Sequence, residues 1–207
     1  SGGSYFGQTM TEGYIYTIAG DGTISYGGDG GAATAAQLTF PFGVSVDSAG
    51  NVYVADSGNN RVRFVPKANG TYFGESMTAN RIYTIAGDGS SGSSGDGGAA
   101  TSAQLGLISG VAADSEGNVY MTDNSGMISN KTRVRMVPAS GGTYFGQSMT
   151  ANYIYTIAGN GTGGYLADGV AATSTRINNP ATARMDADGN VYIADYLNAR
   201  IRFVPRA

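Results

Sequence analysis

Apolar residues occur along this chain in short runs that end at glycine-rich turns, a pattern typical of β-strands rather than helices. Residues 43–56 predict a hairpin of two apolar strands around an Asp-x-x-Gly-Asn turn. Gly50 falls where such a turn requires a positive φ, which glycine adopts without steric cost. The same hairpin recurs at residues 110–123 and 182–195, so the pattern indicates three repeats.

Other landmarks recur with the same spacing. The motif Asn-Val-Tyr begins at positions 51, 118 and 190, so its copies are separated by 67 and 72 residues. The motifs Tyr-Thr-Ile-Ala-Gly, Arg-x-Arg-x-Val-Pro and Tyr-Phe-Gly also occur three times each. We expect the five additional residues of the middle repeat within 125–132. Self-similarity at a nearly fixed period is the signature of a repeat architecture.

Each repeat is expected to contain four strands, which in the first repeat span 43–47, 51–56, 61–66 and 81–87. The third strand ends at Pro66, which has no amide to donate to a ladder. Four antiparallel strands per repeat make one blade of a β-propeller, whereas a solenoid uses only one or two. The predicted fold class is therefore all-β, a β-propeller of four-stranded antiparallel blades.

Long glycine-rich segments connect the fourth strand of one repeat to the first strand of the next, at 21–42, 88–109 and 160–181. The fourth strand is outermost and the first innermost, so the connection crosses about three strand spacings of ~4.8 Å each. We expect the excess length to cap one face of the ring, with short helical turns at 32–38 and 99–105.

This pattern resembles the NHL-repeat family of β-propellers. The resemblance rests on Gly-Val-x-x-Asp-x-x-Gly-Asn-Val-Tyr-x-x-Asp, on Asn-x-Arg-x-Arg-x-Val, and on Ile-Ala-Gly-x-Gly followed by Gly-Asp-Gly-Gly-Ala-Ala-Thr. It recurs three times, with some drift, over almost the whole chain. The long loops are similar to those of bacterial extracellular NHL proteins, which implies an extracellular or cell-surface parent. The family includes enzymes, RNA binders, protein binders and adhesion modules, so the fold alone does not choose a function.

The first and last residues of the chain do not coincide with the boundaries of a blade. Residues 1–20 contain a fourth strand without the three that should precede it, and residues 182–207 contain three strands without a fourth. The chain is thus expected to form a single propeller arc with complete blades at 43–87 and 110–159 and a split third blade. Propellers close with roughly four to eight blades, and three blades cannot form a ring.

We therefore expect a homodimer that closes by strand exchange. The amino-terminal strand of each chain would complete the last blade of the other, giving a six-bladed ring with two-fold symmetry. A nine-bladed trimer and a longer parent chain with more repeats are the alternatives. The opening Ser1-Gly-Gly-Ser is linker-like and no methionine precedes it, which favours an engineered piece or a fragment.

Composition removes several classes of function. The 207 residues include no Cys and no His, which excludes disulfides, thiolate or imidazole metal sites, and catalysis by Ser-His-Asp or Cys-His groups. A net charge of −3 with 12 scattered Lys and Arg residues disfavours nucleic acid as a partner. No apolar run is long enough to span a bilayer. We expect no cofactor, and the sequence does not identify a ligand.

Charged residues at repeated positions predict one structural ion pair in each blade. Every second strand ends in Asp and every third strand begins with Arg, and the expected pairs are Asp56–Arg61, Asp123–Arg133 and Asp195–Arg200. The resemblance to NHL proteins implies that these pairs are structural. The alternative is a ring of carboxylates that binds a cation.

The glycine-rich connections carry three weak metal candidates, Asp29, Asp96 and Asp168. Acidic loops of this kind can bind calcium through carboxylate and backbone oxygens. Each short loop has only one carboxylate and none has EF-hand spacing, so the pattern favours turn formation instead.

Arg184 differs from its counterparts in the other repeats. It occupies the place of Ser45 and Ala112 in the innermost strand, which lines the central channel of a propeller. Two copies of Arg184 in a two-fold ring could hold an anion in the channel. The alternative is drift between repeats, with the side chain reaching solvent.

These observations favour a non-catalytic, self-assembling propeller scaffold. The first alternative is a ligand- or protein-binding module of a larger bacterial surface protein. The second is a metal-dependent propeller hydrolase or lactonase, a class whose channel metal is held by Glu, Asn and Asp. Glu12, Glu75 and Glu116 all lie outside the predicted innermost strands, which disfavours this last alternative.

Overall fold

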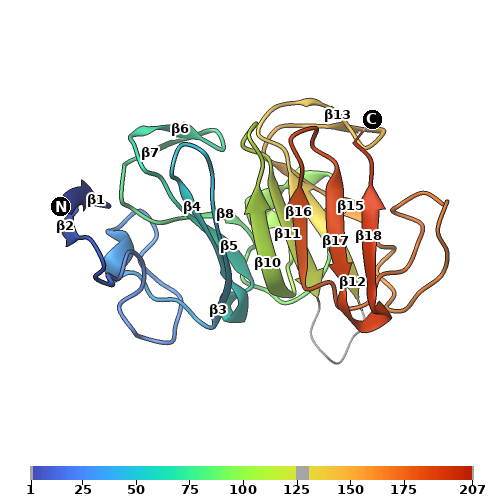
Figure 1. Cartoon of the computed structure of the whole chain (residues 1–207), viewed down its shortest axis with the longest axis horizontal. Helices are drawn as coiled ribbons and strands as arrows, with labels where there is room; N and C mark the ends of the chain where they lie inside the picture. Colours follow the sequence, from blue (N-terminus) through green and yellow to red (C-terminus); the bar gives the residue numbers. More distant parts are fainter. Residues whose placement is uncertain (1, 125–130, 207) are drawn as a thin grey trace.

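A computed structural model describes residues 2–124 and 131–206 of the chain (Figure 1). In these ranges the regular elements are β-strands and single-turn 3-10 helices. The all-β prediction is therefore confirmed. The expected insertion within 125–132 falls almost wholly outside the described residues. No helix in the two described ranges is long and apolar enough to cross a membrane.

Three antiparallel sheets follow one another along the chain. Sheet 1 has the order β3 (Pro41–Val46), β4 (Val52–Asp56), β5 (Arg61–Val65) and β8 (Tyr83–Ala86). Sheet 2 has the order β10 (Leu107–Ala113), β11 (Val119–Asn124), β12 (Thr132–Val137) and β15 (Tyr153–Ala158), with β9 (Gly98–Ala99) added at the outer edge. Sheet 3 contains β16 (Thr182–Met185), β17 (Val191–Asp195) and β18 (Arg200–Val204).

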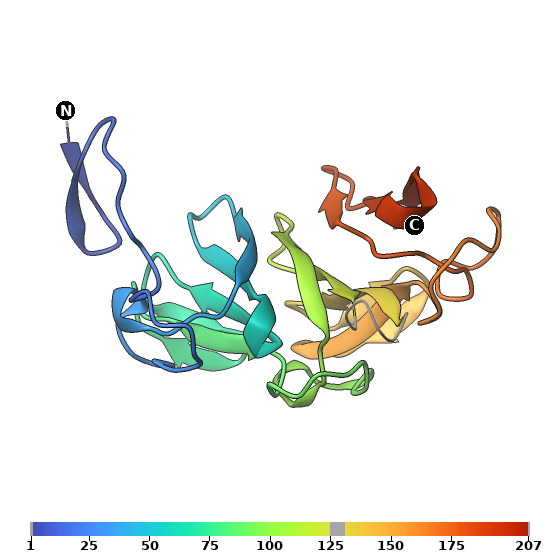
Figure 2. The same cartoon turned by 90° about the horizontal axis from the view of Figure 1, so that it is seen from below.

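The sheets stand side by side like the blades of a propeller, with the innermost strands β3, β10 and β16 adjacent (Figure 1). Figure 2 shows an open arc, with the N-terminal hairpin at one end and sheet 3 at the other. The four strands predicted for the first repeat are confirmed as the four strands of sheet 1, with bounds that differ by at most two residues.

A small two-stranded hairpin precedes each fourth-strand segment and was not predicted. The hairpins are β1 (Gly2–Tyr5) with β2 (Gln8–Thr11), β6 (Gly70–Tyr72) with β7 (Glu75–Met77), and β13 (Gly142–Tyr144) with β14 (Gln147–Met149). The recurring Phe-Gly pair forms each turn, with φ angles of 51° at Phe73 and 79° at Gly74. Two consecutive positive φ angles are typical of a type I′ hairpin turn.

Four 3-10 turns complete the described elements. The connecting segments carry η1 (Ala33–Ala35) and η3 (Ala100–Ser102), which confirms the helical turns predicted there. The second and third strands of sheets 1 and 3 are joined by η2 (Ser57–Asn59) and η4 (Tyr196–Asn198).

Apolar side chains fill the spaces between neighbouring sheets. Phe64 and Ile108 belong to a cluster between sheets 1 and 2, and both are fully buried. Met136 and Val191 belong to a second cluster, between sheets 2 and 3, and are equally buried. A third cluster joins the free side of sheet 1 to the N-terminal segment, where Ile18 is half-buried. Removal of this apolar surface from water favours the stacking of the sheets.

Glycine near the middle of an inner strand lets neighbouring sheets approach closely. A Cβ atom on Gly43 would lie 3.2 Å from the Cα atom of Gly110. A Cβ atom on Gly110 would lie 3.0 Å from the carbonyl oxygen of Ala181 and 3.1 Å from the Cα atom of Thr182. These contacts are to backbone, which cannot move aside as the end of a flexible side chain can.

We expect Gly110→Ala to lower the free energy of unfolding by about 1–3 kcal/mol, because the methyl group overpacks the joint between sheets 2 and 3. Gly141→Ala is the matched control, since a Cβ there would meet only ordinary contacts, the closest at 3.7 Å. Urea unfolding followed by circular dichroism measures both. Equal losses of unfolding free energy in the two variants would contradict a close contact between Gly110 and sheet 3.

The fourth strand expected within residues 1–20, at residues 14–20, is not formed in the single chain. Its counterparts β8 and β15 pair with β5 and β12. The three strands that should precede residues 14–20 are not present in the chain, so this stretch has no ladder to join. The expectation that it completes the last blade of a partner chain stays a prediction.

Candidate functional site

Sheet 3 exposes a strand edge and side chains that are buried in the other two sheets. Ile201 and Phe203 of β18 are 72% and 52% exposed. Their counterparts in β5, Val62 and Phe64, have no exposed surface. The difference arises because sheet 2 packs against this face of β5, whereas none of the described sheets packs against the same face of β18.

The other end of the arc is exposed in the same way. Ile15 is 99% exposed, whereas its counterpart in the first repeat, Ile82, is fully buried. Val44 of β3 is 60% exposed, whereas its counterpart Val111 is 1% exposed because sheet 1 covers it. Contiguous apolar surfaces of this kind mark interaction sites in soluble proteins.

Beside β18 the surface is hollowed. Two adjoining hollows, of about 460 and 480 Å³, share Val170, Ala172, Phe203 and Val204 among their lining residues. In sheet 2 the strand β15 occupies the equivalent place against β12. An open strand edge next to hollows with both polar and apolar lining residues can accept an extended segment, whose main chain extends the sheet while its side chains fill the hollows.

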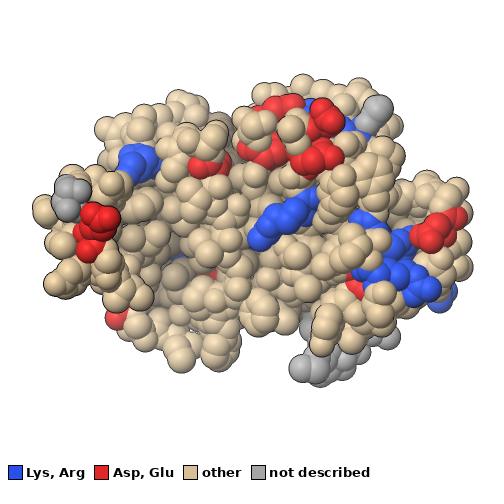
Figure 3. All heavy atoms as spheres, in the orientation of Figure 1, with Lys and Arg blue, Asp and Glu red and all other residues tan. Residues whose placement is uncertain are grey.

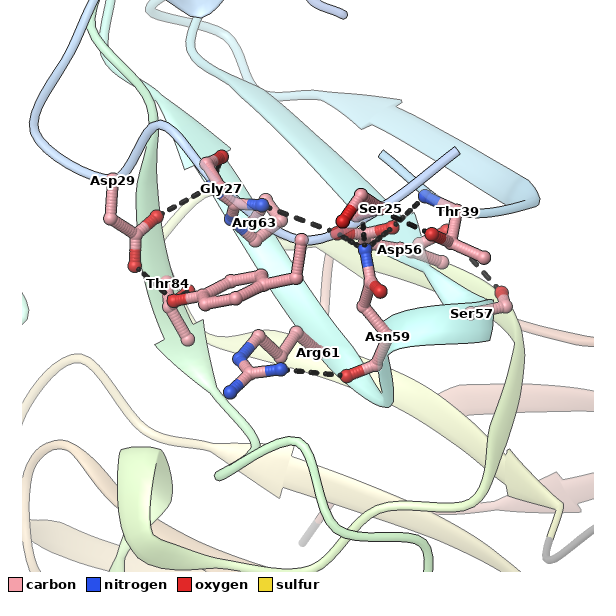
Figure 4. Close-up of polar contacts among 12 residues, drawn as sticks. Ser25, Gly27, Asp29, Thr39, Asp56, Ser57, Asn59, Arg61, Arg63 and Thr84 are labelled. Atoms are coloured by element: carbon pink, nitrogen blue, oxygen red, sulfur yellow. Dashed lines mark hydrogen bonds and ion pairs between the residues drawn. The ribbon is translucent and has the colours of Figure 1, made fainter. Parts of the chain in front are cut away.

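An Asp–Arg–Asp network with a buried strand-end aspartate recurs in every sheet. Figure 4 shows the first, in which Arg63 lies 3.2 Å from Asp56 through Nη1 and 2.6 Å from Asp29 through Nη2. The three networks are Asp56–Arg63–Asp29, Asp123–Arg135–Asp96 and Asp195–Arg202–Asp168. Each one ties the end of the second strand to the long connecting loop through the third strand, so it holds the sheet and its loop together.

The predicted ion-pair partners of the strand-end aspartates were wrong. The expected arginines were Arg61, Arg133 and Arg200, and the observed ones lie two residues further along each strand. Arg61 stands opposite Asp56 in the ladder, but its guanidinium donates to the carbonyls of Asn59 and Asp88 at 3.0 and 2.7 Å. It also lies 3.7 Å from the centroid of the Tyr26 ring.

The repeated Arg-x-Arg motif contains both the expected arginine and the one that contacts the strand-end aspartate. Alternate residues of a strand share one face, so both arginines of each motif lie on the side of the aspartate. A long side chain can reach the diagonal neighbour across a ladder. The second arginine reaches the strand-end carboxylate in this way. The first donates to backbone carbonyls, and in sheets 1 and 3 it also lies over a tyrosine ring.

The loop aspartates considered for calcium supply the second carboxylate of each network. Asp29 accepts a hydrogen bond from the Tyr26 hydroxyl at 2.9 Å, and Asp96 accepts one from the Thr156 hydroxyl at 2.6 Å. Asp168 accepts one from the Tyr165 hydroxyl at 3.1 Å. Among the described residues no three carboxylates gather closely enough to bind a metal ion.

The third network is less enclosed than the other two. The Arg202 side chain is 12% exposed, against none for Arg135, and the Asp168 side chain is 70% exposed, against 39% for Asp96. In sheet 2 the outer strand supplies Thr156 to this position. Among the described residues no outer strand joins sheet 3, so its network lacks that cover.

Burial raises the pKa of the Asp123 carboxyl above its ordinary value, although Arg135 and the amide of Gly106 favour the ionised form. The carboxyl therefore holds its proton more readily in the folded chain than in the unfolded one. Ionisation of Asp123 consequently costs stability as the pH rises from the ordinary value through the raised one. Arg135 is the cation that offsets this cost.

Tyr53 and Tyr120 donate hydrogen bonds of 3.0 Å to the turn aspartates Asp47 and Asp114. Burial, followed by the nearby carboxylate, raises the pKa of both phenols far above the ordinary value. The hydrogen bonds join the second strand of each sheet to its turn.

We expect Tyr53 and Tyr120 to stay un-ionised in the folded protein above pH about 10, where ordinary tyrosines titrate. Stability should fall as the pH rises through that region, because the unfolded chain loses protons that the folded chain retains. Phenolate absorbance of the wild type and of Tyr53→Phe/Tyr120→Phe measures this. A smaller phenolate signal from the folded variant than from the folded wild type, at any pH below unfolding, would contradict it.

Arg184 lies on the innermost strand β16, at an exposed position, as the sequence predicts. Its Nη1 atom donates to the carbonyl of Val111 on β10 at 3.2 Å and to that of Ala183 at 2.9 Å. The side chain thus joins two neighbouring inner strands. The hypothesis that it holds an anion stays a prediction.

Comparison with known proteins relates the chain to one repeat family. The family described as NHL repeat matches residues 38–63, which cover the hairpin of β3 and β4 and the beginning of β5. A segment is 50% identical over 50 residues to Teneurin-1 of Caenorhabditis elegans, and it represents 22% of this chain and 2% of that protein.

Two solved structures match at the level of the fold. One is a structural genomics protein of unknown function from Bacteroides thetaiotaomicron, with a TM-score of 0.52, 16% identity, and coverage of 74% of this chain and 32% of that chain. The other is an auxiliary nutrient binding protein from Bacteroides ovatus, with a TM-score of 0.52, 18% identity, and coverage of 76% and 35%. The chain spans about a third of each of these structures.

Proposed function

We propose that this chain, a member of the NHL-repeat family of β-propellers, is a non-catalytic propeller arc that completes its ring with a second copy of itself. The observation that carries the proposal is the match between its two open edges. The edge of β18 lacks a fourth strand, and residues 15–20 are identical in sequence to residues 82–87 and 154–159 of the other two repeats.

The complete sheets provide the template for this pairing. In sheet 1 the ladder between the third and fourth strands places Phe64 opposite Tyr83. The same register, transferred through the repeat, places Tyr16 of a second copy opposite Phe203. Exposed apolar side chains on both edges, including Ile15, would then be buried.

The pairing would also complete the third network. In sheet 2 Thr156 lies on the outer strand and donates to Asp96 at 2.6 Å. Its counterpart in the N-terminal segment is Thr17, which in the transferred register stands opposite Arg202. Thr17 of the second copy would then reach Asp168, whose side chain is 70% exposed in the single chain.

Local hydrogen bonds already hold the N-terminal segment as they hold the fourth strands. The amide of Thr11 donates to the Tyr16 hydroxyl at 2.9 Å, and the amide of Gly20 donates to the carbonyl of Ala33 at 2.9 Å. The corresponding bonds of the other repeats are Thr78–Tyr83, Thr150–Tyr155, Gly87–Ala100 and Gly159–Ala172. A segment ordered before binding loses less conformational entropy on association.

Two such arcs, related by a two-fold axis, make a closed ring of six blades, within the range that propellers adopt. A trimer would make nine. In a longer parent protein, further repeats would occupy the same two edges. Thr182 stands where the inner strands of sheets 1 and 2 carry glycine, so we expect the joint between arcs to be wider than the joints inside the chain.

The absence of a catalytic role is part of the proposal. It is supported by the lack of His and Cys in the sequence and by the engagement of the repeated carboxylates with arginines. For the parent protein we propose an extracellular or cell-surface location, from the resemblance of the long loops to those of bacterial extracellular relatives.

A second candidate function is that of a binding module within a larger bacterial surface protein. It is favoured by the likeness of the fold to the auxiliary nutrient binding protein of Bacteroides ovatus. A ligand-dependent rise in melting temperature, in a screen of small nutrients, would support this candidate.

Engineered disulfides test the strand pairing directly, because the native chain has no cysteine. We expect Tyr16→Cys/Phe203→Cys to form a covalent dimer on oxidation, since directly opposed positions of a ladder bring Cα atoms within disulfide range. Tyr16→Cys/Arg202→Cys is the control, because its second cysteine points to the opposite face of the sheet. Equal yields from the two variants, or no covalent dimer from the first, would contradict the pairing.

A further inference from the structure

One ion pair already links two neighbouring sheets of this chain. Arg206, just after β18, donates to both carboxylate oxygens of Glu116, at 2.6 and 2.7 Å. Glu116 lies in the turn of sheet 2, and Arg206 lowers the pKa of its carboxyl. The Arg206 guanidinium also lies 5.2 Å from the centroid of the Tyr144 ring, in the hairpin of sheet 2. A cation of the later sheet thus contacts an acid and an aromatic ring of the earlier one.

The repeat places equivalent residues at every joint between sheets. The cation position follows the proline that ends each third strand, and its backbone amide donates to the asparagine of the turn. These bonds are Lys67–Asn51 at 2.8 Å, Ala139–Asn118 at 2.9 Å and Arg206–Asn190 at 3.0 Å. The acid position precedes the turn glycine and is occupied by Ala49, Glu116 and Asp188.

The charges at these positions differ between joints. The joint between sheets 1 and 2 combines Ala139 with Ala49, and so has no ion pair at this position. The joint between sheets 2 and 3 combines Arg206 with Glu116. A joint between sheet 3 of one copy and sheet 1 of another would combine Asp188 with Lys67, which are again opposite in charge.

Lys67 lies over aromatic rings of a small hairpin, as Arg206 does. Its Nζ atom lies 5.1 Å from the centroid of the Tyr5 ring and 4.8 Å from that of Phe6. Tyr5 is the counterpart of Tyr144, and its hairpin would join sheet 3 of the partner in the proposed ring. In the described part of the single chain no preceding sheet lies at this end of the arc to place an acidic residue opposite Lys67.

The acidic residue that would face Lys67 in the proposed ring is Asp188, at the sheet 3 end of the arc. Asp188 is exposed in the turn between β16 and β17. Figure 3 shows acidic side chains gathered at the top of the molecule, where the turns of sheets 2 and 3 lie in Figure 1. At this position the two open ends are therefore opposite in charge.

We infer that Lys67 of one copy and Asp188 of the other form an ion pair at each of the two joints between arcs. The inference rests on the proposed assembly of two copies and deepens it, because it names the charged residues that select a second copy as the partner. The open strand edge and the hollows beside it could accept any suitable strand, whereas this ion pair requires both ends of this chain.

Charge reversal tests the pair. Lys67→Glu and Asp188→Lys each place like charges at both joints, and we expect each to raise the dissociation constant of its homodimer about tenfold. A mixture of the two variants should form a heterodimer about as tight as the wild type, because one joint then has reversed charges and the other is native. Sedimentation equilibrium of each variant and of the mixture measures this. Glu75→Lys is a matched control away from the joint and should leave the constant unchanged.

Each outcome has a distinct meaning. A dimeric wild type whose affinity neither single variant changes, with no preference for the heterodimer, would overturn the ion pair and leave the strand pairing intact. A monomeric wild type would overturn both. Salt of about 1 M, where the Debye length is ~3 Å, should shrink the difference between the variants and the wild type.

Discussion

We expect deletion of residues 1–20 to convert a dimer of about twice 21.1 kDa into a monomer. The deletion removes the strand that would pair with the edge of β18, so the ring would not close and Ile201 and Phe203 would keep their 72% and 52% exposure. Each large apolar side chain buried at a joint contributes about 1.5–3 kcal/mol, and the ring has two joints. We therefore expect the dissociation constant to rise at least about a hundredfold, measured by light scattering behind a sizing column.

Point substitution separates this effect from folding. Ile15 is 99% exposed in the single chain, so Ile15→Asp has no contacts there to lose, yet its counterpart Ile82 is fully buried in sheet 1. We expect Ile15→Asp to weaken the dimer while the unfolding of the monomer is unchanged. Deletion of residues 1–12 removes the hairpin and the Thr11–Tyr16 hydrogen bond but retains the strand, so it should weaken assembly less than deletion of residues 1–20 does. A dimer that survives the loss of residues 1–20 would contradict the pairing.

We expect Arg135→Met to lower the free energy of unfolding by about 3–5 kcal/mol, because it leaves a buried carboxylate without its cation. Arg135 is fully buried and contacts Asp123 at 3.2 Å and Asp96 at 2.7 Å. Arg133→Met is the matched control: its guanidinium makes a contact of 3.5 Å to the carbonyl of Ser93, and we expect a loss below about 1 kcal/mol. Denaturant unfolding of both variants measures the difference, and equal losses would contradict the role of the network.

The stability loss caused by Arg135→Met should depend on pH in a definite direction. The pKa of Asp123 is already raised by burial, and removal of Arg135 should raise it further. The variant can relieve the unpaired charge by protonation, so its deficit should shrink as the pH falls toward about 4 and grow as the pH rises. Asp123→Asn, combined with Arg135→Met, should be less destabilised than the sum of the single changes. A deficit independent of pH would contradict this account.

The strands of the complete sheets were predictable because each is marked locally. Glycine sits where the turns need positive φ, as Gly50 does with a φ of 87°. The small hairpins were missed for a local reason as well. Their turns place Phe73 at a φ of 51°, in a region where glycine and asparagine are the expected residues, and their strands have only three or four residues.

The ion-pair networks were predictable only in part. The aspartate at the end of each second strand was identified, but which arginine of the Arg-x-Arg motif reaches it depends on side-chain direction. The second acid, Asp29, lies 34 residues from Arg63, and no local spacing marks that pairing. The strand at residues 14–20 could not be confirmed from the single chain, because a strand forms only beside a neighbour.

The solution mass tests the central claim most directly. Two arcs that close a ring predict about twice 21.1 kDa for the wild type, by light scattering behind a sizing column. Three times the chain mass would replace the two-fold ring with a nine-bladed one. A monomer over the whole accessible concentration range would contradict the assembly of two copies.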